Sequence, residues 1–398
     1  MKINKTILAG ALALGVVSLA EAGTVYITGS TAMRGAVRTA LLTAAPANKV
    51  FNGVPAYTAW EGDDGSHVTA GASANWMAFV GNDLSGNPLT IQCHWSGSEA
   101  GIKDVAQSLN ADFLSAAGSD GGDHFTNVPS GANLISQPVD LALGDNSQAF
   151  SLNKTPTLFT NKFVGVITFK WVRNNGLWTG TNVSAAQIKQ AFSGACPRAQ
   201  FDGDSTHTLD YVYVSGRDKF SGTRVNAFGD SGFGIGSLPT QIEIDKATGD
   251  MIEVGGLGSG IYSGDYGWDS GGLLANSLGV ATTNKTDQVN GGTGYSAIAY
   301  LSNGDATTAI AAGAKELTYN GVTFNRNNII EGTYSMWGNA FMFQRQTPVA
   351  GAQAQAVYTG LAINGGIDAA ISATGASQIR VGDMHSTRSG PNGVPIHN

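Results

Sequence analysis

The residues best suited to hold an anion lie at 215–224, in the order Ser-Gly-Arg-Asp-Lys-Phe-Ser-Gly-Thr-Arg. They follow an alternating apolar run at 209–214 that predicts a β-strand, and the residues after them can begin a helix. At such a junction, backbone N–H groups point from the positive end of the helix dipole. Arg217 offers two parallel N–H donors, and Ser221 and Thr223 offer hydroxyls, which suits a tetrahedral oxyanion. Taken alone, these ten residues fit a polar surface turn equally well.

Three further turns of small polar residues each follow a predicted strand. They are Gly29-Ser30-Thr31-Ala32 after the strand at 24–28, Ser96-Gly97-Ser98 after the strand at 88–95, and Gly144-Asp145-Asn146-Ser147 after the strand at 138–143. Helices predicted at 33–42 and from 102 onwards would place the first two turns at helix N-termini, where anions bind. Each turn by itself also fits an ordinary N-cap or, for Asp145, an Asx-turn.

Asp145 is the residue that could select the anion. An ionised carboxylate can only accept hydrogen bonds, so it repels a fully deprotonated anion. It can accept the O–H of a monohydrogen phosphate, but it gains nothing from sulfate. A carboxylate beside donor-rich turns therefore favours a protonated oxyanion.

The rest of the chain supplies elements that could position these turns. A length of 398 residues fits about two domains. Further strands are predicted at 162–172, 295–301 and 332–343, a short helix at 183–194, a hairpin at 240–254, and C-terminal helices at 350–373 with a break at Gly365-Gly366. Residues 226–292 are rich in glycine and look like an insertion.

Composition and the N-terminus indicate an exported protein. Only 13% of the residues are charged, and the net charge of −7 argues against nucleic acid and anionic membranes as partners. Residues 1–5 form a basic segment, 6–19 an apolar one, and Ala20-Glu21-Ala22 a cleavage pattern. We expect 1–22 to be a signal peptide. The apolar run is too short to span a bilayer, and no later run is long enough, so we expect a soluble product.

The sequence contains no pattern that indicates a metal site or an enzyme. Its two cysteines, Cys93 and Cys196, could pair in an oxidising compartment or stay as buried thiols. No metal-ligand spacing occurs, so we expect no metal and no cofactor. Ser221 has no recognisable nucleophile motif, and no Gly-x-Ser-x-Gly lies at a strand–helix elbow, so we expect no catalytic residues and no enzymatic activity.

The four turns, in this order, resemble those of the periplasmic phosphate-binding proteins of ABC transporters, which have the type 2 periplasmic binding protein fold. The resemblance implies an α/β protein of two lobes joined by two crossover strands, here 163–172 and 295–301. Lobe I would be 23–161 plus 295–398. Lobe II would be 162–294 and would carry the glycine-rich insertion.

The resemblance also implies a set of phosphate ligands. In this sequence they are Thr31, Ala32, Ser98, Asp145, Arg217, Ser221, Gly222 and Thr223. Asp145 would accept the phosphate proton, Arg217 would pair with phosphate oxygens, and the others would donate from hydroxyls or backbone N–H groups. Three positions depart from the family pattern. Ala32 replaces an aromatic residue, Glu99 adds a charge beside the pocket, and Lys219 stands where an aspartate often orients the arginine.

We therefore expect a periplasmic or otherwise exported solute-binding protein. It would be a monomer that captures inorganic phosphate and delivers it to an ABC transporter permease. Two alternatives remain open at this point. One is a binder of another oxyanion, and the other is an envelope structural or adhesive protein that uses the same fold.

Overall fold

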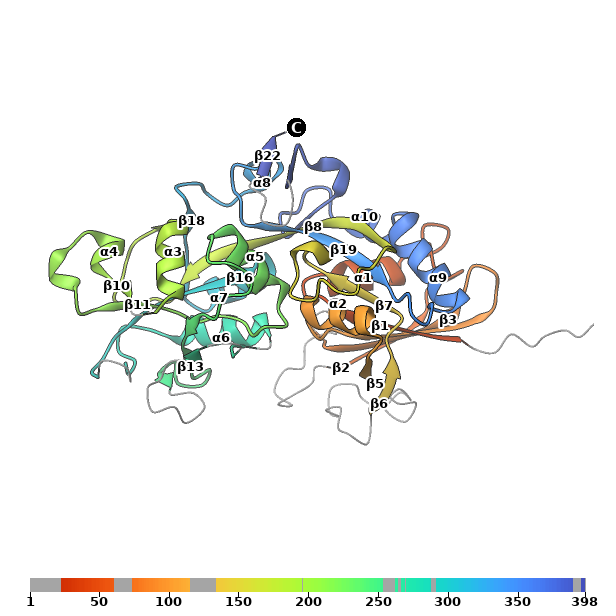
Figure 1. The fold of residues 1–398 in the computed structure, drawn as a ribbon, viewed down its shortest axis with the longest axis horizontal. Coiled ribbons are helices and arrows are strands. Elements are labelled where there is room, and N and C mark those ends of the chain that lie inside the picture. The colour runs from red at the N-terminus through yellow and green to blue at the C-terminus, as the bar shows by residue number, and fades with distance from the viewer. Residues whose placement is uncertain are drawn as a thin grey trace, which may run out of the picture.

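A computed structural model of the chain contains two groups of elements connected by long strands (Figure 1). The structure describes residues 23–60, 74–114, 134–194, 196–252, 262–263, 266–268, 270–287, 291–388 and 395–397. The predicted signal peptide at 1–22 lies outside the described residues. Within them, no helix combines the length and the apolar character needed to cross a membrane.

Among the described residues, the main sheet contains twelve strands. Its path runs β10 (Cys196–Pro197), β11 (Tyr211–Val214), β16 (Ser296–Ser302), β8 (Asn161–Arg173), β19 (Trp337–Gln344), β7 (Leu141–Gly144), β1 (Gly23–Gly29), β4 (Pro88–His94), β3 (Trp76–Asn82) and β2 (Ala56–Trp60), while β17 (Lys315–Glu316) and β20 (Gln378–Ile379) pair with β8 off this path. β1 is parallel to β4 and β7, and β11 is parallel to β16. Each half of the sheet therefore has a parallel centre.

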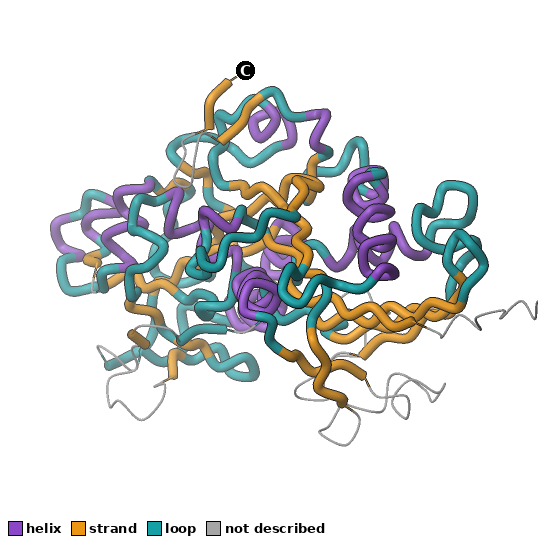
Figure 2. The backbone as a smooth tube through the Cα atoms, turned by 45° about the vertical axis from the view of Figure 1, so that its right-hand side comes forward, coloured by secondary structure: helices purple, strands orange, loops and turns teal. Residues whose placement is uncertain are grey.

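Helices lie on both sides of the strands (Figure 2). They are α1 (Arg34–Leu42), α2 (Ser98–Gln107), α3 (Ala185–Phe192), α4 (Ala199–Asp202), α5 (Gly222–Asp230), α6 (Gly271–Val280), α7 (Asn303–Ala311), α8 (Arg326–Ile330), α9 (Ala352–Tyr358) and α10 (Gly366–Ala370). The π-helical turn Thr359–Ile363 joins α9 to the break at Gly365, whose positive φ of 72° ends the run as predicted.

Short elements complete the described chain. They are the strand pairs β5 (Asn110–Leu114) with β6 (Leu134–Pro138), β9 (Asn182–Val183) with β18 (Thr318–Tyr319), β12 (Thr240–Gln241) with β15 (Tyr262–Ser263), β13 (Glu243–Ile244) with β14 (Met251–Ile252), and β21 (Ser386–Arg388) with β22 (Pro395–His397), and the 3₁₀ turns Gln148–Phe150, Ser205–His207 and Val381–Asp383. The β13–β14 pair is antiparallel, which confirms the predicted hairpin.

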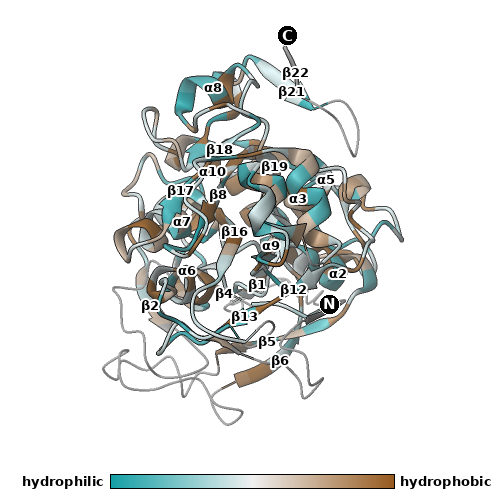
Figure 3. Cartoon of the chain, turned by 90° about the vertical axis from the view of Figure 1, so that its left-hand side faces the viewer, coloured by the Kyte–Doolittle hydropathy of each residue, from teal (hydrophilic) through white to brown (hydrophobic). Residues whose placement is uncertain are grey.

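The central strands are buried on both faces, as in other doubly covered parallel sheets. Val25 and Ile27 of β1 join the core beneath α1 and α9, whereas Tyr26 packs with the core residues of α2 on the other face. Val212 and Val214 of β11 likewise share a core with α3 and α5, and Tyr213 between them packs on the α6 side. Figure 3 shows hydrophobic residues along β16 in the interior and hydrophilic ones on α7 at the side. The structure confirms the predicted α/β class.

β8 connects the two halves of the sheet. Its N-terminal part, Asn161–Thr168, pairs with β19, and its C-terminal part, Phe169–Arg173, pairs with β16. Among the described strands, β16 itself pairs only with β11 and this C-terminal part. The chain therefore returns to the first half at β19 rather than at 295–301, because the next strands after β16 still pair with β8 and β9 of the second half. The division into two lobes stays a prediction, with this later return point.

The possible disulfide between Cys93 and Cys196 is not present. Both cysteines are free and buried. Cys93 lies on β4 and Cys196 on β10, which is one end of the sheet, so six strands lie between them along the path. They are buried thiols, the second of the two interpretations that the sequence allowed. Burial raises the pKa of the Cys196 thiol to about 11.

Candidate anion-binding site

Three of the four polar turns meet at one edge of the sheet. β4, β1 and β7 are neighbours and run parallel, so the turns that follow them leave the sheet at the same edge. The backbone ties them together, because Ser30 N–H donates to Leu143 O at 2.8 Å and Gly97 N–H donates to Gly29 O at 2.9 Å. Ligands of open α/β sheets bind at this carboxyl edge of the strands.

Asp145 lies at the centre of these turns and is buried. Its carboxylate accepts a hydrogen bond from Ser30 Oγ, and its backbone N–H donates to Ser98 Oγ at 3.1 Å. Burial raises the pKa of the Asp145 carboxyl to about 6. The hydroxyls of Ser30 and Ser98 and the positive charge of Arg217 act in the opposite direction, whereas the negative charge of Glu99 raises this pKa further.

The fourth turn comes from the other half of the sheet, and the start of α5 packs directly on Asp145. A methyl group on Gly222 would overlap Ser98 Oγ and would lie 2.9 Å from Asp145 Oδ2. Asn226 Nδ2 of α5 donates to Asp145 O at 3.2 Å, and Glu99 N–H donates to Phe220 O at 2.9 Å. The N-termini of α2 and α5 therefore meet beside one carboxylate.

α5 begins at Gly222, three residues earlier than the predicted start at Val225. Ser221 is its N-cap, and its Oγ accepts from Arg224 N–H at 3.3 Å. The first N–H groups of a helix have no acceptor inside the helix. The earlier start therefore turns the predicted ligands Gly222 and Thr223 into the first helical turn, where the dipole favours an anion most strongly. Both residues are buried there.

Arg217 is buried and held by groups of its own half. Its backbone N–H donates to the hydroxyl of Tyr300 at 2.9 Å, and its Nε–H donates to Trp268 O at 2.9 Å. Lys219 stands where the resemblance implied an orienting aspartate, and the acceptor for Arg217 Nε is the Trp268 carbonyl. The positive charge of Arg217 lowers the pKa of the Asp145 carboxyl.

Glu99, the second departure from the family pattern, turns away from the candidate site. Its buried carboxylate accepts from Ser151 Oγ at 2.7 Å, from Leu152 N–H at 2.8 Å and from Asn146 Nδ2 at 2.9 Å. Burial raises the pKa of this carboxyl, and these donors oppose the rise. The carboxylate holds the loop after Asp145 against the start of α2.

Thr31 and Ala32 follow Ser30 in the turn after β1. They line a pocket of about 180 Å³ whose walls also include Arg34, Asn303 and Asp305. It is Ser30, one residue earlier, that contacts Asp145. The hydroxyls of Ser30 and Thr31 are adjacent in the sequence. Which of the two faces Asp145 depends on the direction in which the turn leaves β1. Whether Thr31 and Ala32 touch a ligand stays a prediction.

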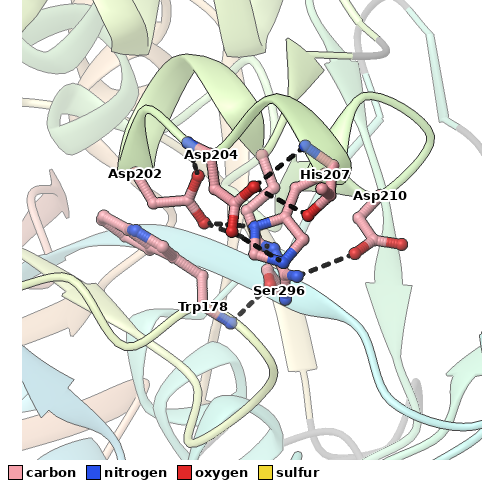
Figure 4. Close-up of polar contacts among 8 residues, drawn as sticks. Trp178, Asp202, Asp204, His207, Asp210 and Ser296 are labelled. Carbon is pink, nitrogen blue, oxygen red and sulfur yellow. Dashed lines mark hydrogen bonds and ion pairs between the residues drawn. The ribbon is translucent and has the colours of Figure 1, made fainter.

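A second charged group lies at the far edge of the sheet, around α4 and the start of β11 (Figure 4). Arg198 contacts Asp210 at 2.8 Å and Asp202 at 3.5 Å, and His207 contacts Asp202 at 2.8 Å and Asp204 at 3.8 Å. These contacts connect α4 to the residues before β11, which indicates a structural role. Among the described residues, no group of three or more His, Cys, Asp or Glu side chains could hold a metal ion.

No protein-family model and no curated protein matches the chain. Among solved structures, it is similar to a putative phosphate ABC transporter substrate-binding protein from Clostridium perfringens with bound phosphate, at 13% identity and a TM-score of 0.48, covering 90% of this chain and 100% of that one. An ABC-type phosphate transport receptor from Vibrio cholerae has 11% identity and a TM-score of 0.43, covering 86% and 95%. A possible phosphate-binding protein from Planctomyces limnophilus has 12% and 0.40, covering 90% and 93%. Values this low leave the ligand to be argued from the site itself.

Proposed function

We propose that the chain is a solute-binding protein that captures inorganic phosphate between the turns after β1, β4 and β7 and the start of α5. The convergence of Ser98, Asp145 and Gly222 from both halves of the sheet is the observation that carries this proposal. Arg217 adds the positive charge that an anion needs. The remaining predicted ligands, Thr31, Ala32, Ser221 and Thr223, belong to the same proposal.

The buried carboxylate favours phosphate over sulfate. The Asp145 carboxylate accepts a hydrogen bond from Ser30. Only an anion that carries a proton can offer Asp145 a new donor, because a carboxylate cannot donate when ionised. Monohydrogen phosphate has such a proton at neutral pH and sulfate does not. The pKa of about 6 leaves Asp145 mostly ionised at pH 7 and above.

The donors suffice for tight binding. Hydrogen bonds to a charged group contribute about 1.5–3 kcal/mol each. About six of them exceed the ~8 kcal/mol that corresponds to micromolar affinity. The hydrogen-bond free energy beyond this value would offset the cost of dehydrating the anion and of ordering the two halves around it.

The transport context is part of the proposal. We infer an exported monomer that delivers phosphate to an ABC transporter permease, and a binding role without a catalytic step. The two lobes would be the halves of the sheet on either side of β8. Support comes from the N-terminal pattern in the sequence and from a candidate site built of elements from both halves.

Calorimetric titration of the purified chain tests the function. We expect phosphate to bind at micromolar concentration or tighter at pH 7.5, and sulfate to bind at least tenfold more weakly. Stronger binding of sulfate would point to a different oxyanion. The absence of heat with either anion, at protein concentrations above 10 µM, would favour an envelope structural or adhesive role and would reject the capture of oxyanions.

A further inference from the structure

The Arg217 turn is clamped by a short segment of the glycine-rich insertion, Tyr266-Gly267-Trp268, to which the sequence assigns no role. Trp268 N–H donates to Gly216 O at 2.9 Å, and Asp218 N–H donates to Trp268 O at 3.0 Å. The two segments of the chain pair here as in a parallel sheet, with Arg217 opposite Trp268. The segment therefore behaves as an added strand along the turn that carries the arginine.

The same segment fixes the arginine side chain. The Trp268 carbonyl accepts from Arg217 Nε at 2.9 Å in addition to the backbone N–H of Asp218. The indole Nε1 of Trp268 donates to Ser215 Oγ at 3.2 Å, and the neighbouring Tyr266 carbonyl accepts from Gln241 Nε2 at 2.9 Å. Because Nε is occupied in this way, the guanidinium plane has a set direction before any ligand arrives.

Gly267 makes this close approach possible. A methyl group at Gly267 would overlap the carbonyl of Arg217 and would lie 2.7 Å from Asp218 N. Its φ of 153° is also one that L side chains rarely adopt. Gly271, at the start of α6, has a related role, because a methyl group there would overlap the Asp305 carboxylate and lie 3.3 Å from Arg217 Nη1. Two glycines of the insertion therefore bring its backbone against the arginine.

We propose that Tyr266-Gly267-Trp268 is a positioning segment that orients Arg217 toward the bound anion. The inference rests on the proposed phosphate capture and adds to it. Lys219 stands where an orienting aspartate was expected, and the carbonyl of Trp268 accepts from the arginine Nε. Pre-orientation of this kind increases affinity because less side-chain freedom is lost on binding.

The test is the Gly267→Ala variant, with Gly272→Ala as the matched control. A methyl group on Gly272 meets its nearest atom, Ser270 Oγ, at 3.6 Å, which is ordinary contact. We expect Gly267→Ala to weaken phosphate binding about tenfold or more in calorimetry, and Gly272→Ala to change it less than twofold. Thermal unfolding checks that both variants fold, and Trp268→Phe, which removes only the Nε1–H donor, is a milder second variant with an expected loss of about two- to threefold.

A second measurement separates positioning from a general loss of structure. In an Arg217→Lys background, Gly267→Ala should lower the phosphate affinity less than twofold, because both substitutions act through the Arg217 side chain. In a Ser98→Ala background, Gly267→Ala should keep its full effect on phosphate affinity, because Ser98 acts independently of that side chain. In ¹⁵N spectra, the Arg217 Nε–H should exchange with water faster in Gly267→Ala than in wild type. Equal losses in both backgrounds, or unchanged exchange, would overturn the positioning role. A wild-type chain that binds no phosphate overturns the proposed function and this inference with it, whereas tight binding by wild type and Gly267→Ala alike overturns only the inference.

Discussion

The α2 turn and the α5 turn meet at Asp145, but the two halves of the sheet hold them with different kinds of groups. In the first half, the buried carboxylate of Glu99 ties the α2 turn to the loop after Asp145. In the second half, neutral groups, the Tyr300 hydroxyl and the Trp268 carbonyl, hold the turn that carries Arg217. Burial raises the pKa of the Asp145 carboxyl between them, the Ser30 and Ser98 hydroxyls and the charge of Arg217 oppose the rise, and the charge of Glu99 adds to it. Residues of both halves therefore contribute to the ionisation of Asp145.

Removing the cation of the second half should have the largest effect. We expect Arg217→Met to weaken phosphate binding by more than about 100-fold, since two hydrogen bonds to a charged group contribute about 1.5–3 kcal/mol each. Lys219→Met, two residues away, is the control and should change the affinity less than about threefold. Calorimetry at pH 7.5 measures both. Equal losses in the two variants would show that only the overall charge of the turn matters.

Neutralising the Asp145 carboxyl should have the second largest effect. The folded pKa of Asp145 is raised from 3.8 to about 6, so the folded chain holds this proton more tightly than the unfolded chain. The protonated Asp145 carboxyl therefore contributes its full stabilisation of the folded state below pH ~4. This stabilisation is lost as the pH rises through about 6, which lowers the free energy of unfolding by about 3 kcal/mol. Asp145→Asn should remove this loss in the phosphate-free protein, as measured by urea unfolding at pH 4 and pH 7.

The same variant should alter anion selectivity. The side-chain amide that Asp145→Asn introduces could donate an N–H to a deprotonated oxygen, so this variant should weaken phosphate binding about tenfold and strengthen sulfate binding. Asp104→Asn is the matched control, because burial also raises the pKa of Asp104 to about 6. It should share the stability change but leave selectivity as it is. A preference for phosphate over sulfate that stays unchanged in Asp145→Asn would contradict the role of Asp145.

Separating the two halves should have an intermediate effect. A methyl group in Gly222→Ala would overlap Ser98 Oγ and push the α5 turn away from Asp145. We expect a loss of about 1 kcal/mol in phosphate binding, roughly fivefold, which is the net contribution of one ordinary hydrogen bond. Gly236→Ala, whose methyl group would meet no atom within 4 Å, is the control. An unchanged affinity in Gly222→Ala would mean that the anion does not bind between these turns.

Removing the acid of the first half should have the smallest effect. Glu99 raises the pKa of Asp145 through its charge, so Glu99→Gln should lower that pKa by less than about one unit, as expected for a minor coulombic contribution. Phosphate binding should then persist to lower pH. Calorimetric titrations between pH 5 and 8 would reveal the shift of the midpoint. A midpoint that moves upward would exclude this electrostatic link between the two turns.

Much of the fold follows from local sequence patterns. The strands at 24–28, 88–95 and 162–172 appear within a residue or two of their predicted ends, because alternating or continuous apolar runs are a property of the segment itself. The helix at 183–194 is shorter at its ends, but Ser184 forms the predicted N-cap as part of a capping box. The start of α5 was predicted three residues late, because glycine and threonine have low helix propensity and only the Ser221 cap marks the boundary.

The sequence by itself determined the α/β class, the four polar turns and Asp145 as the residue of interest, because these depend on neighbours along the chain. The tertiary structure decided which hydroxyl faces Asp145, Ser30 and not Thr31, and where Glu99 points. It also decided that Cys93 and Cys196 are apart and that Trp268 holds Arg217. Each of these depends on strand order and on contacts between residues tens of positions apart, which no local pattern encodes.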